Sequence, residues 1–268
     1  MVKRRKKRRR GHFWTYVLTF LAIVAGGAIA QDPSVIQHPT AENATALVKQ
    51  VVQAGQLKTN QTNQVTAPKQ SVDAKQLATE TYRGTEIVAV NHNQPTFTKA
   101  DLSLGNGAWQ KYGNLDRLNR VTAANAMLQR DLMPTAKREA LVVSPTGWHN
   151  KEYTVNGKRT YLYNRSHLIG YQLTGQNNNV KNLMTGTRDL NAPDMENYES
   201  KVAAYLKQTD NHVRYQVEPV FRNDELVARG VHMQAQSIET GDIKFNIYIF
   251  NVQPGITINY QTGYSQKE

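Results

Sequence analysis

The fold is decided around one stretch of nine residues, Leu162-Tyr163-Asn164-Arg165-Ser166-His167-Leu168-Ile169-Gly170. It includes the end of a short β-like run at Tyr161 and Tyr163. Side chains two apart on a strand point to the same side, so Arg165 and His167 are expected to face one substrate together. A neutral imidazole can take a proton from water near neutral pH, and a guanidinium can clamp phosphate oxygens. The plainer alternative is a half-buried histidine beside a surface arginine.

A second group of polar residues lies downstream. Asn191 is expected at the entry of a helix, and Glu199 follows two turns later on roughly the same side. Mg²⁺ favours oxygen ligands, keeps most of its water and often needs only one or two protein contacts. An asparagine carbonyl with a nearby carboxylate meets that description. Taken alone, the pair is explained more simply as an N-cap asparagine and a solvated glutamate.

Apolar periodicity predicts two helices in this region and upstream of it. In the first, steps of three and four residues run up to Pro134 through Leu115, Leu118, Val121, Asn125 and Leu128. In the second, Asp194 is the predicted N-cap, and the period is carried by Met195, Tyr198, Val202, Tyr205 and Leu206.

The C-terminal part of the chain alternates with period two, which is typical of strands. The alternation appears in three sets, Val213/Tyr215/Val217, Val231/Met233/Ala235 and Phe245/Ile247/Ile249. Asn223-Asp224 and Thr240-Gly241-Asp242 supply turn residues between the sets. An antiparallel meander is therefore expected after a helical segment, which makes the class α+β, an antiparallel sheet with packed helices.

The N-terminal third divides into two further parts. Residues 3–10 carry eight positive charges and precede the uncharged run 13–30, which ends in the small-x-small pattern Ala28-Ile29-Ala30. This layout predicts export, with 1–30 a cleaved signal peptide or a retained membrane anchor. Residues 31–81 are expected to form a low-complexity stalk, because 31–80 contain nine Gln and no Phe, Tyr or Trp. The folded domain is predicted over 82–268.

Composition removes several classes of function. Subtracting the eight leader charges from the formal net charge of +12 leaves +4, so nucleic-acid binding must be argued from a site. The chain has no cysteine, which excludes disulfides, thiolate nucleophiles and cysteine-based zinc sites. His149, His212 and His232 have no partners at metal-ligand spacing, and Ser166 lacks the Gly-x-Ser-x-Gly elbow of serine esterases.

The whole pattern resembles the DNA/RNA non-specific endonucleases, the ββα-metal nucleases of Asp-Arg-Gly-His type, and within them the exported streptococcal and lactobacillar branch of DNA-entry nucleases. His167, Asn182, Asn191 and Glu199 resemble the active-site series of that family. The resemblance runs from Gly113 to Ile238 and includes 113–118, 120–122, 131–134, 145–148 and 163–175. Asn164 and Ser166 replace the Asp and Gly of the signature, which leaves open what orients His167.

The resemblance implies a mechanism and a ββα-metal motif. His167 is the expected general base. Arg165 is expected to bind the negative charge that develops on the phosphorane. Asn191 and Glu199 are expected to hold one Mg²⁺, with Mn²⁺ as a substitute. Asn182 and Arg188 are the expected substrate-binding residues, Asn182 by positioning a loop or the phosphate. Substrates are then DNA and RNA, recognised through the phosphate backbone and cut to 5′-phosphates.

Two rival functions remain from the sequence. One is a surface nucleic-acid receptor that has lost catalysis, with Asn164 and Ser166 as marks of decay. The other is an adhesion or wall-associated module in which the stalk matters most. Residues 13–30 would contact a membrane if uncleaved, and no protein partner is indicated. The expected location is extracellular, anchored or secreted.

Overall fold

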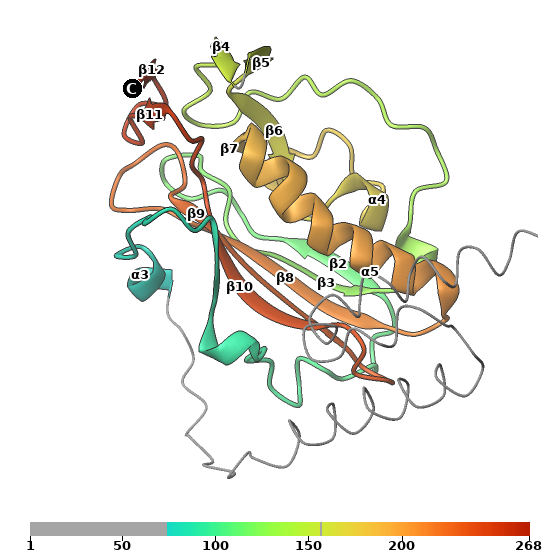
Figure 1. The fold of residues 1–268 in the computed structure, drawn as a ribbon. Helices are drawn as coiled ribbons and strands as arrows, with labels where there is room; N and C mark the ends of the chain where they lie inside the picture. The colour runs from blue at the N-terminus through green and yellow to red at the C-terminus, as the bar shows by residue number, and fades with distance from the viewer. Residues whose placement is uncertain (1–73, 156) are drawn as a thin grey trace, which may run out of the picture. The chain divides into compact units, whose positions relative to one another are not determined.

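Six antiparallel strands form the main sheet of the part of the chain that the computed structural model describes, residues 74–155 and 157–268 (Figure 1). Their order across the sheet is β1 (Ile87–Ala89), β10 (Lys244–Phe250), β9 (Gly230–Ser237), β8 (Val213–Val220), β3 (Ala124–Leu128) and β2 (Trp109–Tyr112). The consecutive strands β8, β9 and β10 are the predicted meander. The α+β class is therefore confirmed.

Helix α5 (Glu196–Gln208) packs against the sheet, as Figure 1 shows. Its buried residues Val202 and Leu206 belong to the same core as Val213, Tyr215 and Val217 of β8. The second predicted helix is thus confirmed, with a different start. Asp194 is not its N-cap but lies in the preceding π-helical turn η7 (Leu190–Met195), and Met195 holds the cap position without a side-chain hydrogen bond.

The first predicted helix, over 115–128, is wrong. Residues 124–128 form β3, which pairs with β2 on one side and β8 on the other. Upstream, the Asp116 carboxylate accepts hydrogen bonds from the backbone N–H groups of Leu118 and Arg120 and closes a turn in which Asn119 has a φ of 61°. The apolar residues that suggested one helical stripe come from this turn and from a strand that is buried in the sheet.

A two-stranded unit beside the main sheet leads into the functional region. Strands β6 (Tyr163–His167) and β7 (Leu183–Thr187) pair antiparallel, with the short helix α4 (Tyr171–Thr174) and the turn η6 (Val180–Asn182) between them. The chain then passes through η7 into α5, which gives the ββα order expected from the resemblance. The hairpins β4 (Glu152–Val155)–β5 (Lys158–Tyr161) and β11 (Ile256–Ile258)–β12 (Ser265–Lys267) complete the strands.

The last residues of the predicted stalk pack on the domain. Ala74–Leu77 forms the helix α3, and Leu77 is buried in a cluster with Val90, Val220, Tyr248 and Phe250. The remaining short turns are η4 (Asn91–Asn93) and η5 (Arg130–Leu132).

Residues 1–73, with the predicted leader and most of the stalk, lie outside the described part. Within the described residues, no helix has the length and apolar character needed to cross a membrane.

Candidate active site

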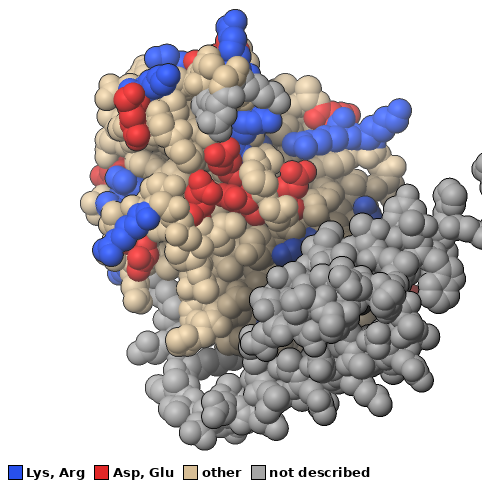
Figure 2. All heavy atoms as spheres, in the orientation of Figure 1, with Lys and Arg blue, Asp and Glu red and all other residues tan. Residues whose placement is uncertain are grey.

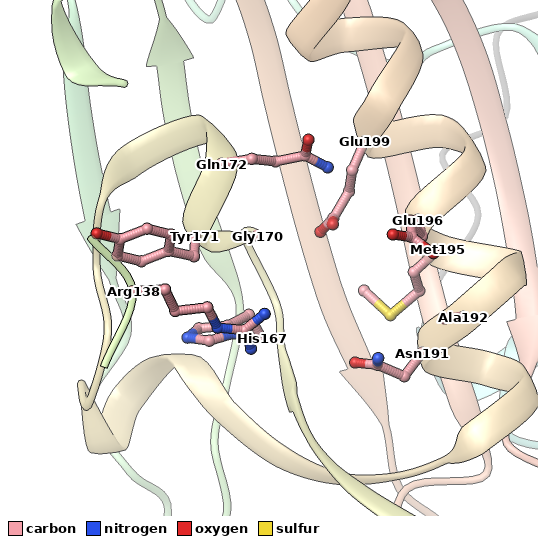
Figure 3. A pocket seen from close by; sticks show the side chains of 10 residues that line it. All are labelled: Arg138, His167, Gly170, Tyr171, Gln172, Asn191, Ala192, Met195, Glu196 and Glu199. Atoms are coloured by element: carbon pink, nitrogen blue, oxygen red, sulfur yellow. The ribbon is translucent and has the colours of Figure 1, made fainter. Parts of the chain in front are cut away.

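A cavity of about 260 Å³ lies between the end of β6, the start of α4 and the first turns of α5 (Figure 3). Three predicted site residues line it, namely His167 from β6, Asn191 from η7 and Glu199 from α5. In Figure 3 the side chains of Asn191 and Glu199 extend from the helical side into the cavity, and His167 lies across from them. The ββα arrangement therefore gathers an imidazole and two oxygen-bearing side chains in one place.

The imidazole of His167 is held in one tautomer. Its Nε2 atom lies 2.9 Å from the backbone carbonyl oxygen of Asn177. A carbonyl can only accept a hydrogen bond, so Nε2 donates and the neutral ring keeps its lone pair on Nδ1. Burial lowers the pKa of His167 below 6.5 and the nearby Arg138 lowers it further, while hydrogen bonding to the backbone of Asn177 and of Gln176 opposes the shift. His167 is therefore a neutral imidazole, able to accept a proton, near neutral pH.

Asn177 resolves the question left open by the two signature replacements. Asn164 lies on β6 next to Arg165, and the group that orients His167 is a backbone carbonyl instead of a side-chain carboxylate. Ser166 is fully buried and lies against Gly186 of β7, where an added Cβ would come 2.3 Å from the Ser166 hydroxyl oxygen. The hairpin therefore accommodates a serine at this position through a glycine on the facing strand.

Glu199 is a carboxylate in a buried setting. Its side chain is 9% exposed, and burial raises its pKa to about 8, against the lowering effects of hydrogen bonds from the Gly170 backbone and the Gln172 side chain. A group that burial discourages from ionising is stabilised as an anion by a bound cation. An added Cβ at Gly170 would come 2.4 Å from Oε2 of Glu199, so glycine at 170 is what lets the carboxylate come so close to this turn.

The donor set fits a magnesium ion. Asn191 supplies an amide oxygen and Glu199 a carboxylate, and Mg²⁺ takes oxygen ligands while keeping several waters. Among residues 74–155 and 157–268, no three His, Cys, Asp or Glu side chains are grouped closely enough to hold a metal ion. Any cation here would thus be held by few protein atoms, as the sequence suggested for Asn191 and Glu199.

Arg165 lines a second cavity that adjoins the first. The two cavities share Arg138 and Asn191. The guanidinium carbon of Arg165 lies 4.5 Å from the ring centroid of Trp148, and its Nε donates to the Val143 carbonyl. These contacts fix the side chain and leave its terminal nitrogens available for a phosphate. Arg165 and His167 therefore face one substrate only if it extends over both cavities.

The two predicted substrate-binding residues line neither cavity. Asn182 is fully buried, and its amide forms a reciprocal pair with the backbone of Ile169, at 2.9 Å to the N–H and 3.0 Å to the carbonyl. Of the two roles expected for Asn182, this geometry fits the positioning of the loop before Gly170. Arg188 is exposed just after β7, and its backbone N–H donates to the carbonyl of Leu162.

Arg138 is the site residue that sequence reasoning missed. It lies in the long irregular segment between β3 and β4 and lines both cavities. No periodicity marks such a residue, and the basic pair Lys137-Arg138 is a weak signal in a loop.

Several polar contacts hold the Arg138 segment in place. The Tyr171 hydroxyl donates to the Ala136 carbonyl at 2.7 Å. The amide groups of Asn177 and Asn178 donate to the carbonyls of Glu139 and Ala140 at 3.2 and 3.0 Å. The asparagine run after Gly175 thus fixes the loop that carries Arg138.

Charge on the molecular surface does not by itself indicate a nucleic-acid groove. On the face drawn in Figure 2, acidic side chains gather near the middle and Lys and Arg side chains lie mainly around them. On this face no continuous basic patch is seen among the described residues, and Arg138 and Arg165 are the basic side chains that line the two cavities.

Comparison with known proteins agrees with this geometry. The family model for the DNA/RNA non-specific endonucleases matches residues 102–239. The magnesium-bound crystal structure of NucA from Streptococcus agalactiae is 28% identical, with a TM-score of 0.60 over 68% of this chain and 88% of that one. The structure of Sda1 nuclease with a bound zinc ion is 26% identical, with a TM-score of 0.54 over 60% of this chain and 81% of that one.

A deoxyribonuclease from Streptococcus dysgalactiae subsp. equisimilis is 29% identical, and the match covers 57% of this chain. The chain spans 59% of the length of that protein. Because the family model covers just over half of the 268 residues, the resemblance that the sequence suggested is confirmed. The chain belongs to the DNA/RNA non-specific endonuclease family.

Proposed function

We propose that this protein is a magnesium-dependent endonuclease that hydrolyses phosphodiester bonds of DNA and RNA with little sequence preference. One observation carries the proposal. The Asn177 hydrogen bond places the lone pair of the neutral His167 ring on Nδ1. His167 lines a cavity together with the oxygen donors Asn191 and Glu199. Two similar solved structures contain a metal ion, magnesium in NucA and zinc in Sda1 nuclease.

The residues of the chain divide the work of hydrolysis. Nδ1 of His167 takes a proton from a water molecule as that water attacks phosphorus in line. The bond from phosphorus to the 3′ oxygen breaks, so the phosphate stays on the 5′ oxygen of the downstream fragment and the released 3′ oxygen takes a proton from water. Arg165 and Arg138 bind the non-bridging oxygens, where charge accumulates. Asn191 and Glu199 would hold Mg²⁺, which when bound neutralises the phosphate and stabilises the leaving oxygen.

The absence of base readout follows from the kinds of contact available. Arginine side chains and a cation contact phosphate oxygens, which are the same in every nucleotide. Among the described residues, no contact orients these groups towards the place of a sugar 2′ hydroxyl, which is the group that distinguishes RNA from DNA. Both sugars and all sequences are therefore expected as substrates.

The rival receptor function predicts binding without cutting, and an adhesion module predicts neither. Supercoiled plasmid and a structured RNA are incubated with the purified protein in Mg²⁺, in Mn²⁺ and in EDTA. The proposed enzyme cuts both polymers with either ion and neither polymer in EDTA, leaving 5′-phosphates that a 5′-phosphate-dependent ligase can join. DNA that is retained but uncut in Mg²⁺ would favour the receptor and overturn the proposal.

The pH dependence follows from the lowered pKa of His167. Protonated imidazole cannot accept a proton, so activity falls with pH only when pH passes below that pKa. Because burial and Arg138 lower the pKa of His167, the decline of kcat/KM at saturating Mg²⁺ should occur at lower pH than for an ordinary imidazole with a pKa of about 6.5. Removing the Arg138 charge raises the pKa, so Arg138→Gln should move the decline to higher pH. Lys137→Gln is the control, and a decline at the same pH in both variants would contradict the assignment.

The close approach of Gly170 to Glu199 gives a second prediction. Gly170→Ala places a Cβ against the carboxylate and must displace it. The variant should need more Mg²⁺ for half-maximal activity, by about 10-fold, as is typical when a group supporting a metal site is moved. Gly105→Ala is a matched control, because the nearest atom to its added Cβ, the Ser103 hydroxyl, lies at 3.4 Å. Equal Mg²⁺ dependence of Gly170→Ala and Gly105→Ala would show that Glu199 is not part of the cation site.

We also propose that the enzyme acts outside the cell. The proposal rests on the eight charges and the apolar run of residues 3–30, with 31–81 as a stalk and 82–268 as the nuclease domain. A retained anchor is favoured over secretion because the uncharged run of 18 residues exceeds the usual signal core of about 7–15. Cell fractionation with sequencing of the mature N-terminus distinguishes them. An intact chain in the membrane means an anchor, a chain starting at Gln31 in the medium means secretion, and a soluble cytoplasmic protein would contradict both.

A further inference from the structure

The second cavity, of about 410 Å³, is lined by aromatic residues that the proposed catalysis does not use. It shares Arg138 and Asn191 with the catalytic cavity and is further lined by Trp148, Tyr161 and Arg165. Its volume lies within the range of about 300–1,000 Å³ that is usual for small-molecule sites. A group of nucleotide size that is attached to the phosphate under attack would enter it directly.

Tyr161 is the unusual residue of this cavity. It ends strand β5, and 59% of its surface is exposed. Within the described residues, its ring stacks on no other ring and its hydroxyl makes no hydrogen bond, whereas the neighbouring Tyr163 is buried and donates to the Gly263 carbonyl at 2.9 Å. An aromatic ring that is left open beside a catalytic cavity provides a surface on which a planar base can stack.

The remaining groups of the cavity favour a nucleotide without identifying its base. Arg165 is fixed over Trp148 and offers its terminal nitrogens to a phosphate. Asn150 cannot read a base edge, because its amide is already bonded to both the N–H and the carbonyl of Tyr163. The stacking surface of Tyr161 and the positive charge of Arg138 and Arg165 suit every nucleotide equally. The side chains of Asn164 and Asn191 complete the polar lining.

We propose that this cavity binds one unpaired nucleotide next to the scissile phosphate, with its base stacked on Tyr161. The inference rests on the proposed function and deepens it. In a duplex the faces of each base are covered by its neighbours, so a base reaches Tyr161 only from a single strand, a loop or an end. The enzyme then cuts unpaired nucleic acid more efficiently than paired nucleic acid of the same sequence.

The test compares kcat/KM for one end-labelled oligonucleotide in single-stranded form and annealed to its complement. Tyr161→Ala should lower the ratio of kcat/KM for the single strand to kcat/KM for the duplex by about 5- to 100-fold, the range expected for loss of one stacked base. Tyr161→Phe keeps the ring and should keep the ratio. Tyr264→Ala removes another exposed tyrosine that lines neither cavity and should also keep it. A ratio is unaffected by the fraction of each variant that is folded.

A second substrate tests the contact itself. A short single strand carries one cleavable linkage, with either a normal base or an abasic sugar on each side of it. If a base stacks on Tyr161, Tyr161→Ala should no longer lower kcat/KM once the base on the side of the linkage that binds Tyr161 is missing. A ratio in Tyr161→Ala within twofold of wild type, or a loss that is the same with and without the base, overturns the inference.

Failure of the inference and failure of the proposed function give different results. If the wild-type protein cuts no substrate in Mg²⁺, the proposed function fails. The subsite is then tested by fluorescence anisotropy of the labelled single strand in EDTA. A 5- to 100-fold weaker affinity of Tyr161→Ala supports it, and an equal affinity overturns it.

Discussion

His167→Ala should lower the rate of DNA cleavage by about 10²–10⁴-fold, the usual contribution of a general base. The reason is the geometry of the ring. Nε2 is committed to the Asn177 carbonyl, so Nδ1 is the only nitrogen able to take the proton of the attacking water. Binding of DNA should change little, because Arg138, Arg165 and the cation donors remain. The measurement is single-turnover cleavage at saturating Mg²⁺, with DNA binding measured separately in EDTA.

His149→Ala is the matched control for this experiment. His149 is an exposed histidine that lines neither cavity. Its ring stacks on that of Tyr264, with 4.0 Å between the ring centroids. Its replacement should leave the cleavage rate within about twofold, as is usual for surface changes away from a site. Thermal unfolding of both variants shows whether a loss comes from instability. A folded His167→Ala protein with more than about a tenth of the wild-type rate would show that another group is the base.

Asn191→Ala should raise the Mg²⁺ concentration for half-maximal activity by about 100-fold, and Glu199→Ala by about 10-fold. Asn191 is the proposed direct ligand of the cation; it lines the cavity, and no described residue hydrogen-bonds its amide. Glu199 is expected to act through water, which makes its loss less severe. Activity is titrated against Mg²⁺ for each variant under identical ionic strength.

Conservative variants separate ligation from packing at these two positions. Asn191→Asp keeps an oxygen donor and should need less Mg²⁺ than Asn191→Ala. Glu199→Gln keeps the size of a side chain that lies in a buried position, so a shift in this variant reflects the lost charge. If Asn191→Ala and Glu199→Ala both kept the wild-type Mg²⁺ dependence, the cation would have to bind elsewhere.

The fold could be predicted where one residue pattern has one structural meaning. Alternation in 213–217, 231–235 and 245–249 gave three strands, because the apolar residues of each set lie in the core that includes residues of α5. The segment 115–128 failed for a physical reason. The residues of β3, Ala-Asn-Ala-Met-Leu, end in consecutive apolar side chains and show no clean alternation, so they also satisfy the spacing of a helix.

The site was predicted in part. The positions of His167, Asn191 and Glu199 followed from the order β6, η7 and α5 and from the resemblance. Arg138 could not be found, since its position depends on side-chain hydrogen bonds from Tyr171, Asn177 and Asn178 to a loop. The buried pairing of Asn182 with Ile169 was equally invisible, because a polar residue in a turn gives no sign of whether it faces substrate or backbone.

Chemical rescue tests the central claim, that His167 is the proton acceptor, most directly. Cleavage by His167→Ala is measured with increasing imidazole at constant pH and ionic strength. The account predicts a rate that rises with the concentration of neutral imidazole, and no such rise for Asn191→Ala or for the wild-type protein. A His167→Ala protein that cuts DNA at nearly the wild-type rate without imidazole, or an equal imidazole effect in all three proteins, would contradict it.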